Sequence, residues 1–251
     1  MITKTELDLL VEKYEKPEFI KSDPVQFVHK AGSKFDIEIL GFLSSLFAFG
    51  SRKVFIKKLD DLFFAMGNSP YNFILNGDFE DVSNIDYRFA KSDDIKMILL
   101  VLRKLYSSSR GLEELFEYGY KQSDLVYSAL IAVSDYFYAN AKNLSSGFCF
   151  MVPQPQKGGA MKRMNMFLRW MVRKSSVDLG LWEFMPPADL LIPLDVHVAN
   201  VSRKMGLLNR SSNDFKAVIE LTNKLKEFDP SDPIKYDFAM FGAGVEGLYK
   251  D

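Results

Sequence analysis

Residues 37–50, IEILGFLSSLFAFG, are apolar almost all the way round. Only Glu38 carries a charge, and the run is too long for an ordinary strand, so it predicts a buried helix that ends near Gly50. Other segments show the amphipathic spacing of helices or begin at an Asp-Pro pair. No alternating runs bounded by hairpin turns occur, so the sequence predicts an all-α chain of about ten helices. The clearest of the other helices are expected at residues 7–14, 54–66, 92–105, 125–141 and 232–244.

Two stretches are rich in residues that interrupt helices. Residues 143–160, NLSSGFCFMVPQPQKGGA, contain many Pro, Gly and Ser residues, and residues 181–193 contain three prolines. Both compositions favour loops. No fixed-period repeat and no low-complexity linker divides the chain. We therefore expect one compact all-α unit over residues 1–251.

The composition excludes several classes of site. A single cysteine rules out an internal disulfide, a Cys-based zinc site and a four-thiolate iron–sulfur cluster. Two histidines leave little room for a multi-histidine site, so no metal is expected. No apolar run approaches the roughly 20 residues that span a bilayer, and the first residues do not have the pattern of a signal peptide. We expect a cytoplasmic protein with no membrane partner.

The near balance of 32 Lys and Arg against 33 Asp and Glu hides a basic segment. No acidic residue lies between Asp135 and Asp178. Three of the basic residues there share one helical face by their spacing, and the segment has the charge of a surface for an anionic partner. A solvated basic helix face has the same composition. The basic residues of this segment are Lys142, Lys157, Lys162, Arg163, Arg169, Arg173 and Lys174.

Two short motifs contain candidate catalytic or ligand-binding residues. The first, KGGAMKRMN over residues 157–165, is a glycine turn that leads into a helix. Backbone amides at such a turn bind phosphate groups. The second, PLDVHV over residues 193–198, places Asp195 at the start of a helix that ends near Gly206, where its simplest role is that of an N-cap.

The two motifs together resemble those of the helix-hairpin-helix DNA glycosylase superfamily. In that family a glycine hairpin precedes a catalytic lysine, and an essential aspartate follows in a Leu/Val-Asp-Thr-His-Val helix start. Residue by residue, Gly158 matches the first hairpin glycine, Lys162 the lysine, Asn165 a small polar position, Asp195 the aspartate and His197 the motif histidine.

The motifs also depart from the family pattern. Gly159 and Ala160 alter the usual hairpin, and Val196 replaces the usual threonine. Lys162 and Asp195 lie thirty-three residues apart, a spacing similar to that of the archaeal 8-oxoguanine glycosylase branch, which also lacks iron–sulfur cysteines. The whole chain further resembles an uncharacterised bacterial family with the same core.

This resemblance implies two helical subdomains with a cleft between them, one over residues 50–165 and one over residues 1–49 plus 166–251. It implies excision of a damaged, 8-oxoguanine-like base from double-stranded DNA, followed by AP lyase cleavage. Lys162 is expected to attack C1′ as the nucleophile. Asp195 is expected to stabilise positive charge at the sugar or to deprotonate the lysine. No cofactor is implied beyond a monovalent cation at the hairpin.

Neighbouring residues are expected to bind the DNA and the base. A base flipped out of the duplex needs a pocket, which is usually aromatic, although core packing is the competing role of each ring. His197 and Asn165 are expected to support the site structurally. Phosphate contacts are expected from Lys157, Gly158, Gly159, Arg163, Arg169 and Arg173. The pocket candidates are Trp170, Trp182 and Phe148, and Phe150 and Phe184 are two further candidates.

Two other functions are compatible with the sequence. One is a catalytically silent nucleic-acid-binding module that keeps the fold and the basic face. The other is an all-α protein-interaction domain whose basic helix binds an acidic partner. Salt-dependent binding without base release indicates the first, and the absence of nucleic-acid affinity at moderate salt indicates the second.

Overall fold

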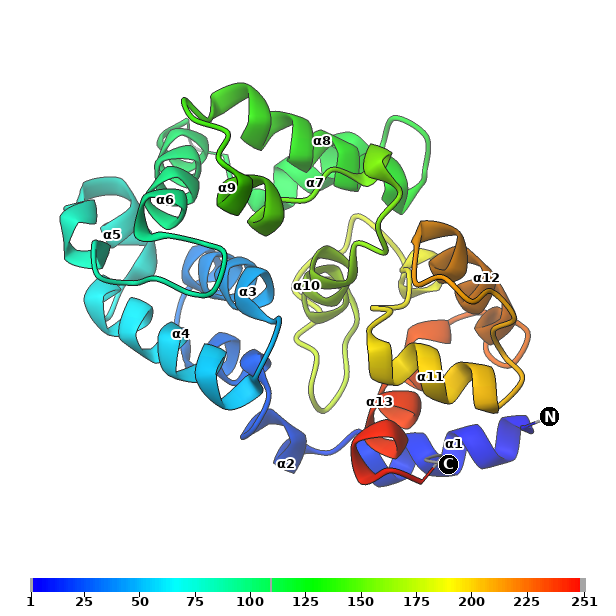
Figure 1. Cartoon of the computed structure of the whole chain (residues 1–251). Coiled ribbons are helices and arrows are strands. Elements are labelled where there is room, and N and C mark those ends of the chain that lie inside the picture. Colours follow the sequence, from blue (N-terminus) through cyan, green and yellow to red (C-terminus); the bar gives the residue numbers. More distant parts are fainter. Residues whose placement is uncertain (1, 109, 249–251) are drawn as a thin grey trace. The chain divides into compact units, whose positions relative to one another are not determined.

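A computed structural model describes residues 2–108 and 110–248. Within these ranges the chain forms thirteen α-helices and five 3-10 helices, with only isolated β-bridges and no strands. The predicted all-α class is confirmed (Figure 1). The expected number of about ten helices is too low, because short helices such as α2 (Pro17–Ile20) and α5 (Pro70–Asn76) show too few turns to produce a clear period.

The chain divides into two compact units. Unit 1 combines residues 1–22 with residues 155–251, and unit 2 spans residues 23–154. These boundaries differ from the expected subdomain boundaries at residues 49/50 and 165/166, and the expectation of one compact all-α unit stays a prediction. Residues 23–49 belong to unit 2 because their long helix packs on other elements of that unit. The glycine turn belongs to unit 1 because it is hydrogen-bonded to residues near 214.

Unit 2 is built around α3 (Lys34–Phe47), the helix predicted from the apolar run at 37–50. Ser33 caps its start by accepting a hydrogen bond from the backbone N–H of Asp36 at 3.2 Å. The helix packs on η1 (Pro24–Lys30), which Asp23 caps by accepting a hydrogen bond from the N–H of Val25. The remaining elements of unit 2 are α4 (Arg52–Met66), α5, η2 (Phe79–Val82), α6 (Ser92–Ser107), α7 (Leu112–Tyr120), α8 (Val126–Asn140) and α9 (Ser146–Met151).

The predicted loop over residues 143–160 contains the short helix α9. Ser145 caps this helix by accepting a hydrogen bond from the N–H of Phe148 at 3.0 Å. Gly147 is required inside it, since a β-carbon there would lie 2.0 Å from a carboxylate oxygen of Asp94. The density of Gly and Ser in this segment thus reflects close packing as well as loop structure.

Unit 1 joins both ends of the chain. Its last helix, α13 (Tyr236–Glu246), packs on α1 (Lys4–Tyr14) and on α11 (Val196–Lys204) (Figure 1). A β-carbon at Gly242 would lie 2.2 Å from the ring of Tyr14, so the glycine allows α1 and α13 to approach closely. The other elements of unit 1 are α2, η3 (Pro155–Lys157), α10 (Lys162–Val172), η4 (Pro187–Asp189), α12 (Phe215–Lys226) and η5 (Pro233–Lys235).

In the part of the chain that the structure describes, no helix is long and apolar enough to cross a membrane.

Candidate functional site

The glycine turn presents Lys162 at the first position of α10. Met161, just before it, has a left-handed backbone with φ of 52°, and Gly158 has φ of 77°. The N–H of Gly158 donates to the carbonyl of Pro155 at 2.8 Å, and the carbonyl of Gly158 accepts from Phe215 at 2.9 Å. These bonds tie the turn to the start of α12. Lys162 itself is half-buried.

The outer side of the turn is open. Lys157, Gly158 and Gly159 are exposed, and a β-carbon added at either glycine would have no atom within 4 Å. A phosphate group can therefore approach the backbone here. The predicted phosphate contacts of these three residues require such access. Whether they bind DNA stays a prediction.

Asp214 anchors the turn from α12. Gly159 forms an isolated β-bridge with Asp214, and Asp214 caps α12 by accepting from the N–H of Ala217 at 3.0 Å. The Arg210 side chain donates to the same carboxylate at 2.7 Å from Nε. This hydrogen bond lowers the pKa of Asp214 to about 2. The carboxylate therefore stays ionised and keeps the cap at any ordinary pH.

Asp195 is the N-cap of α11, as predicted. Its Oδ1 accepts a hydrogen bond from the N–H of Val198 at 2.8 Å, and the side chain is half-buried. His197, two residues later, is exposed, and its ring meets that of Phe241 edge-on with 6.1 Å between centroids. A β-carbon at Gly244 would lie 3.1 Å from that of His197, so the histidine packs α11 against α13.

The buried carboxyl group of Asp237 is under the electrostatic influence of both motifs, through Lys162 of the first and Asp195 of the second. It lies at the start of α13, and burial raises the pKa of Asp237 to about 7, although Arg169 favours its ionised form. The charges of Asp195 and Lys162 also act on it, the first raising and the second lowering this pKa. Lys162 and Asp195, far apart in the sequence, thus lie within electrostatic reach of the same buried carboxyl.

Two of the predicted DNA contacts are wrong. Arg169 and Arg173 lie on the buried face of α10, with only 3% and 5% of their surface exposed. Arg169 donates to Asp178 at 3.1 Å and to Asp237, and its guanidinium lies 4.3 Å from the ring centre of Phe238. A guanidinium enclosed in this way cannot reach a phosphate.

Arg173 is also paired with carboxylates. It donates to Asp232 at 2.9 Å, to Asp178 at 2.8 Å and to Glu15, whose Oε2 is 3.0 Å from Nη2. Burial alone would lower the pKa of Arg173, but the three carboxylates raise it. Both arginines therefore stay charged and connect α10 to the nearby Asp178 and to acids far away in the sequence, so the charge of these two residues is neutralised.

Arg163 differs from these two arginines because it is half-buried. The surrounding protein disfavours its charged form and lowers the pKa of Arg163 to about 10. At neutral pH the guanidinium remains a cation, so Arg163 stays a candidate phosphate contact.

Three of the predicted pocket rings, Trp170, Trp182 and Phe148, are buried, whereas Phe150 is 38% exposed. Trp170 and Trp182 are fully buried in the core of unit 1, where Trp182 meets Phe167 edge-on at 5.2 Å and Phe184 at 5.8 Å. Phe148 is fully buried in the core of unit 2. The competing role, core packing, explains these rings, because a base can stack only on a ring face that it can reach.

The described part of the chain also contains no group of three or more His, Cys, Asp or Glu residues placed to hold a metal ion.

A comparison with family models matches residues 23–246 to the family described as "Protein of unknown function (DUF2400)". The chain belongs to this family. No curated protein and no solved structure matches it. The matched range covers all of unit 2 and residues 155–246 of unit 1, including both motifs, but the family's description assigns no activity.

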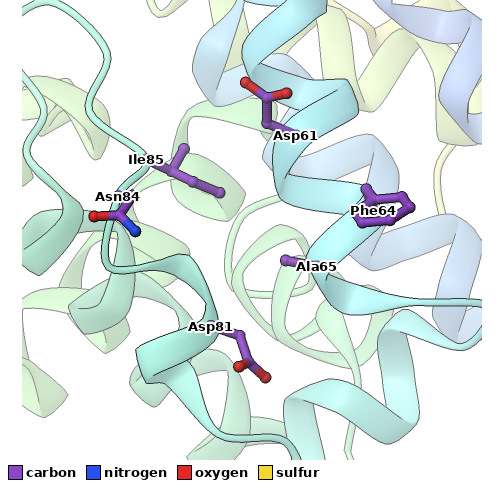
Figure 2. A pocket seen from close by; sticks show the side chains of 6 residues that line it. All are labelled: Asp61, Phe64, Ala65, Asp81, Asn84 and Ile85. Carbon is purple, nitrogen blue, oxygen red and sulfur yellow. The ribbon is translucent and has the colours of Figure 1, made fainter.

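Besides the open glycine turn of unit 1, this DUF2400 protein has a surface depression in unit 2. A depression of about 570 Å³ lies between α4 and the segment around η2, lined by the residues labelled in Figure 2. Asp61 and Asp81 give it acidic walls, and Phe64 at its edge is 90% exposed. An acidic lining repels phosphate, so this depression is not part of the expected DNA-binding surface.

Sequence reasoning missed Asp237 and the inward orientation of the basic face in this DUF2400 protein. One signal was present: in α10, KRMNMFLRWMV, Arg169 stands between the apolar pairs Phe167-Leu168 and Trp170-Met171, which leaves it little solvent-facing surface. Asp237 gave no comparable signal, because a single acid in the first turn of a helix is usually explained by the helix dipole.

Proposed function

We propose that this protein is a DNA glycosylase with AP lyase activity, with Lys162 as nucleophile and Asp195 as its partner. The observation that supports it most is that Lys162 and Asp195, the two residues that match the superfamily motifs, both act on the buried carboxyl of Asp237. The open glycine turn before Lys162 supports it further, since it offers backbone amides to a phosphate next to the amine.

The chemistry requires a neutral amine on Lys162. In this proposal Lys162 attacks C1′ of the damaged nucleoside, the C1′–N bond breaks, and the base leaves with its bonding electrons. The C1′–O4′ bond then opens as the nitrogen lone pair forms the protonated Schiff base, and O4′ takes up a proton. Loss of a C2′ proton by β-elimination then breaks the C3′–O bond, and the 3′ phosphate leaves. Asp195, held at the start of α11, takes the proton from the ammonium or stabilises the positive charge that develops at the sugar.

In this proposal Lys162 loses its proton to a nearby carboxyl group and not through repulsion by neighbouring cations. Because Arg169 and Arg173 are paired with carboxylates, they do not supply the positive field that would lower the pKa of a lysine. The nearby carboxyl groups of Asp195 and Asp237 instead provide sites that can accept its proton. The double-stranded DNA partner and the preference for an 8-oxoguanine-like base rest on the motif resemblance.

Borohydride trapping tests the proposal. Duplexes containing an abasic site or 8-oxoguanine are incubated with the protein and sodium borohydride, and the covalent adduct is quantified on a denaturing gel. We expect an adduct with the native protein, none with Lys162→Gln, and an undiminished adduct with Lys174→Gln, whose lysine is exposed just beyond α10.

The absence of any adduct with the native protein, or an equal adduct with Lys162→Gln, would overturn the proposal. Salt-dependent binding to these duplexes without an adduct would indicate the silent nucleic-acid-binding module instead. A panel of duplexes that each carry one lesion then identifies the preferred base.

A further inference from the structure

A two-residue turn in unit 2 places an arginine and a phenylalanine on the surface. Tyr87 and Ala90 are buried and exchange backbone hydrogen bonds of 2.9 and 3.0 Å across the turn. The Tyr87 hydroxyl donates to the carbonyl of Phe49, which ties the turn to the linker between α3 and α4. Arg88 and Phe89 form the tip, where both are exposed, Phe89 by 59%. The anchored ends thus present these two side chains on a firm support.

Arg88 has an unfavourable backbone conformation. Its φ is 52°, in the left-handed region that glycine adopts without strain. Gly50 makes room for its side chain, since a β-carbon at Gly50 would lie 2.3 Å from Nη1 of Arg88. An arginine at a turn position that suits glycine better indicates that the side chain has a use.

Phe89 belongs to a group of four rings. The ring of Phe89 meets that of Phe150 with 5.2 Å between centroids, and Phe150 meets Phe49 at 4.8 Å. Phe49 in turn lies 4.6 Å from the ring of Tyr87. Phe150, from α9, is 38% exposed, and the guanidinium carbon of Arg88 lies 5.3 Å from the centre of the Phe89 ring. The surface therefore offers two partly exposed rings beside a cation.

Positive charge surrounds these rings. The linker that carries Phe49 leads into α4, and residues 50–58, GSRKVFIKK, contain four basic and no acidic residues. Asp86 is the acid nearest to the tip in the sequence, and its carboxylate is paired with Lys91 at 3.0 Å. An anionic partner is therefore attracted to the exposed rings.

We propose that Arg88, Phe89 and Phe150 form a surface that binds single-stranded DNA, in which unpaired bases stack on the rings and phosphates contact Arg88 and the basic start of α4. Aromatic stacking within positively charged surroundings is how proteins bind single strands of any sequence. In a duplex the faces of each base are covered by its neighbours, so the strand must be unpaired.

An acidic peptide also fits the charge of this surface, but its carboxylate side chains have no planar surface to cover the rings. The choice of DNA over RNA rests on the proposed function, whereas the surface itself lies within unit 2 and is argued without it.

Fluorescence anisotropy tests the inference on the whole protein. One probe is a fluorescein-labelled single strand of about 20 nucleotides, longer than one such surface needs, and another is its duplex. A third has the same length and charge but consists of tetrahydrofuran spacers that carry no bases. We expect binding to the single strand that weakens with salt, and binding to the spacer strand that is about fivefold weaker or more.

Three variants separate stacking from charge and folding. Phe89→Ser removes the exposed ring and should weaken single-strand binding about fivefold or more, with no change for the spacer strand or the duplex. Phe64→Ser is the matched control, since that ring is 90% exposed in the same unit but lies at the acidic depression. Arg88→Gly relieves the left-handed backbone, so it should weaken single-strand binding without lowering the temperature of unfolding.

Four results would overturn the inference. They are native affinity for the single strand in Phe89→Ser, an equal loss of affinity in Phe64→Ser, a defect of equal size on the duplex in Phe89→Ser, and a spacer strand bound as tightly as DNA. Tighter, Phe89-dependent binding of the same sequence as RNA would overturn the choice of DNA. Equally tight, Phe89-dependent binding of a Glu-rich peptide would indicate a protein partner and overturn the inference as well.

This test is independent of borohydride trapping, because the single strand and the spacer strand contain neither a lesion nor an aldehyde. Phe89-dependent binding without any trapped adduct would leave this surface in place and refute the lyase. A trapped adduct without single-strand binding would refute this inference alone.

Discussion

Asp195 caps α11 and also carries the carboxylate that is proposed to act in catalysis, and substitutions can separate these two roles. Asn is as good an N-cap as Asp, so Asp195→Asn is expected to keep the hydrogen bond to Val198 and to leave the free energy of unfolding nearly unchanged. Asp195→Ala removes the cap and is expected to lower that free energy by about 1 kcal/mol. Both variants lose the carboxylate, so both should lose borohydride trapping. Urea denaturation and trapping on one set of samples check this, and full trapping by Asp195→Asn would exclude a catalytic carboxylate.

Asp237 is expected to make stability depend on pH. Burial raises the pKa of Asp237 from 3.8 to about 7, so the native state holds a proton that the unfolded chain releases above about pH 4. This contribution to the free energy of unfolding is therefore largest below pH 4 and is lost as the pH rises to about 7. Asp237→Asn cannot titrate and should lack this component.

Urea denaturation of native protein and Asp237→Asn at intervals from pH 4 to pH 8 isolates this contribution. The difference between their free energies of unfolding should change steadily between pH 4 and pH 7 and become constant above. A difference that does not vary with pH would show that the native Asp237 has an ordinary pKa.

Helix pairs in this protein depend on glycines at close contacts. At Gly242, where α13 meets α1, an added methyl group overlaps the Tyr14 ring, so Gly242→Ala is expected to lower the free energy of unfolding by about 1–3 kcal/mol. Gly32→Ala is the matched control, since its β-carbon has no atom within 4 Å. Thermal unfolding compares the two, and equal transition temperatures would mean that the contact of α1 with α13 is loose.

The glycine turn depends on α12. Asp214→Ala removes the cap of α12 and the charged partner of Arg210, so the strand-like bridge to Gly159 should loosen. We expect weaker binding to a duplex with an abasic site, while α7 and α8 of unit 2 keep their protection from hydrogen exchange. Asp78→Ala, which removes a cap in unit 2, is the control and should not change binding. Unchanged binding in Asp214→Ala would show that the turn needs no support from α12.

The long helices were predictable from the sequence because their period extends over several turns. The helix at 37–50 was found within a few residues of its bounds, as were those at 54–66 and 125–141. Short helices such as α9 escaped because one or two turns give no clear period. The N-cap role of Asp195 was also predictable, since capping depends on local sequence alone.

The electrostatic surroundings of the site were not predictable, because they depend on residues distant in the sequence. A segment without acids suggested an exposed basic face, but Glu15 and Asp232 come to Arg173 from distant parts of the chain, and Asp178, five residues after Arg173, turns back to it. Burial of the three candidate pocket rings follows likewise from tertiary packing. Spacing could group the basic residues on one helix face but could not show which way that face turns.

Unit 1 as a whole is held together by ion pairs between its two ends. Glu15 pairs with the buried Arg173, so Glu15→Ala leaves that guanidinium short of a partner and is expected to cost about 2 kcal/mol of stability. The loss should be local to unit 1. Hydrogen exchange should accelerate in α10 and α13 but not in α7 and α8, and Glu12→Ala, an exposed change on α1, serves as the control. Uniform acceleration across both units would show that they unfold together.

The discontinuous make-up of unit 1 also sets an order of events at the ribosome. Residues 23–154 emerge as a continuous segment that contains every element of unit 2, so this unit can fold while the chain is still being translated. Helix α1 is synthesised before unit 2, yet it must wait for α13, which follows unit 2 in the chain. Lys162, Asp195 and Asp237 therefore come together only after α13 has been synthesised, and a chain that stops before it would carry unit 2 without the candidate site.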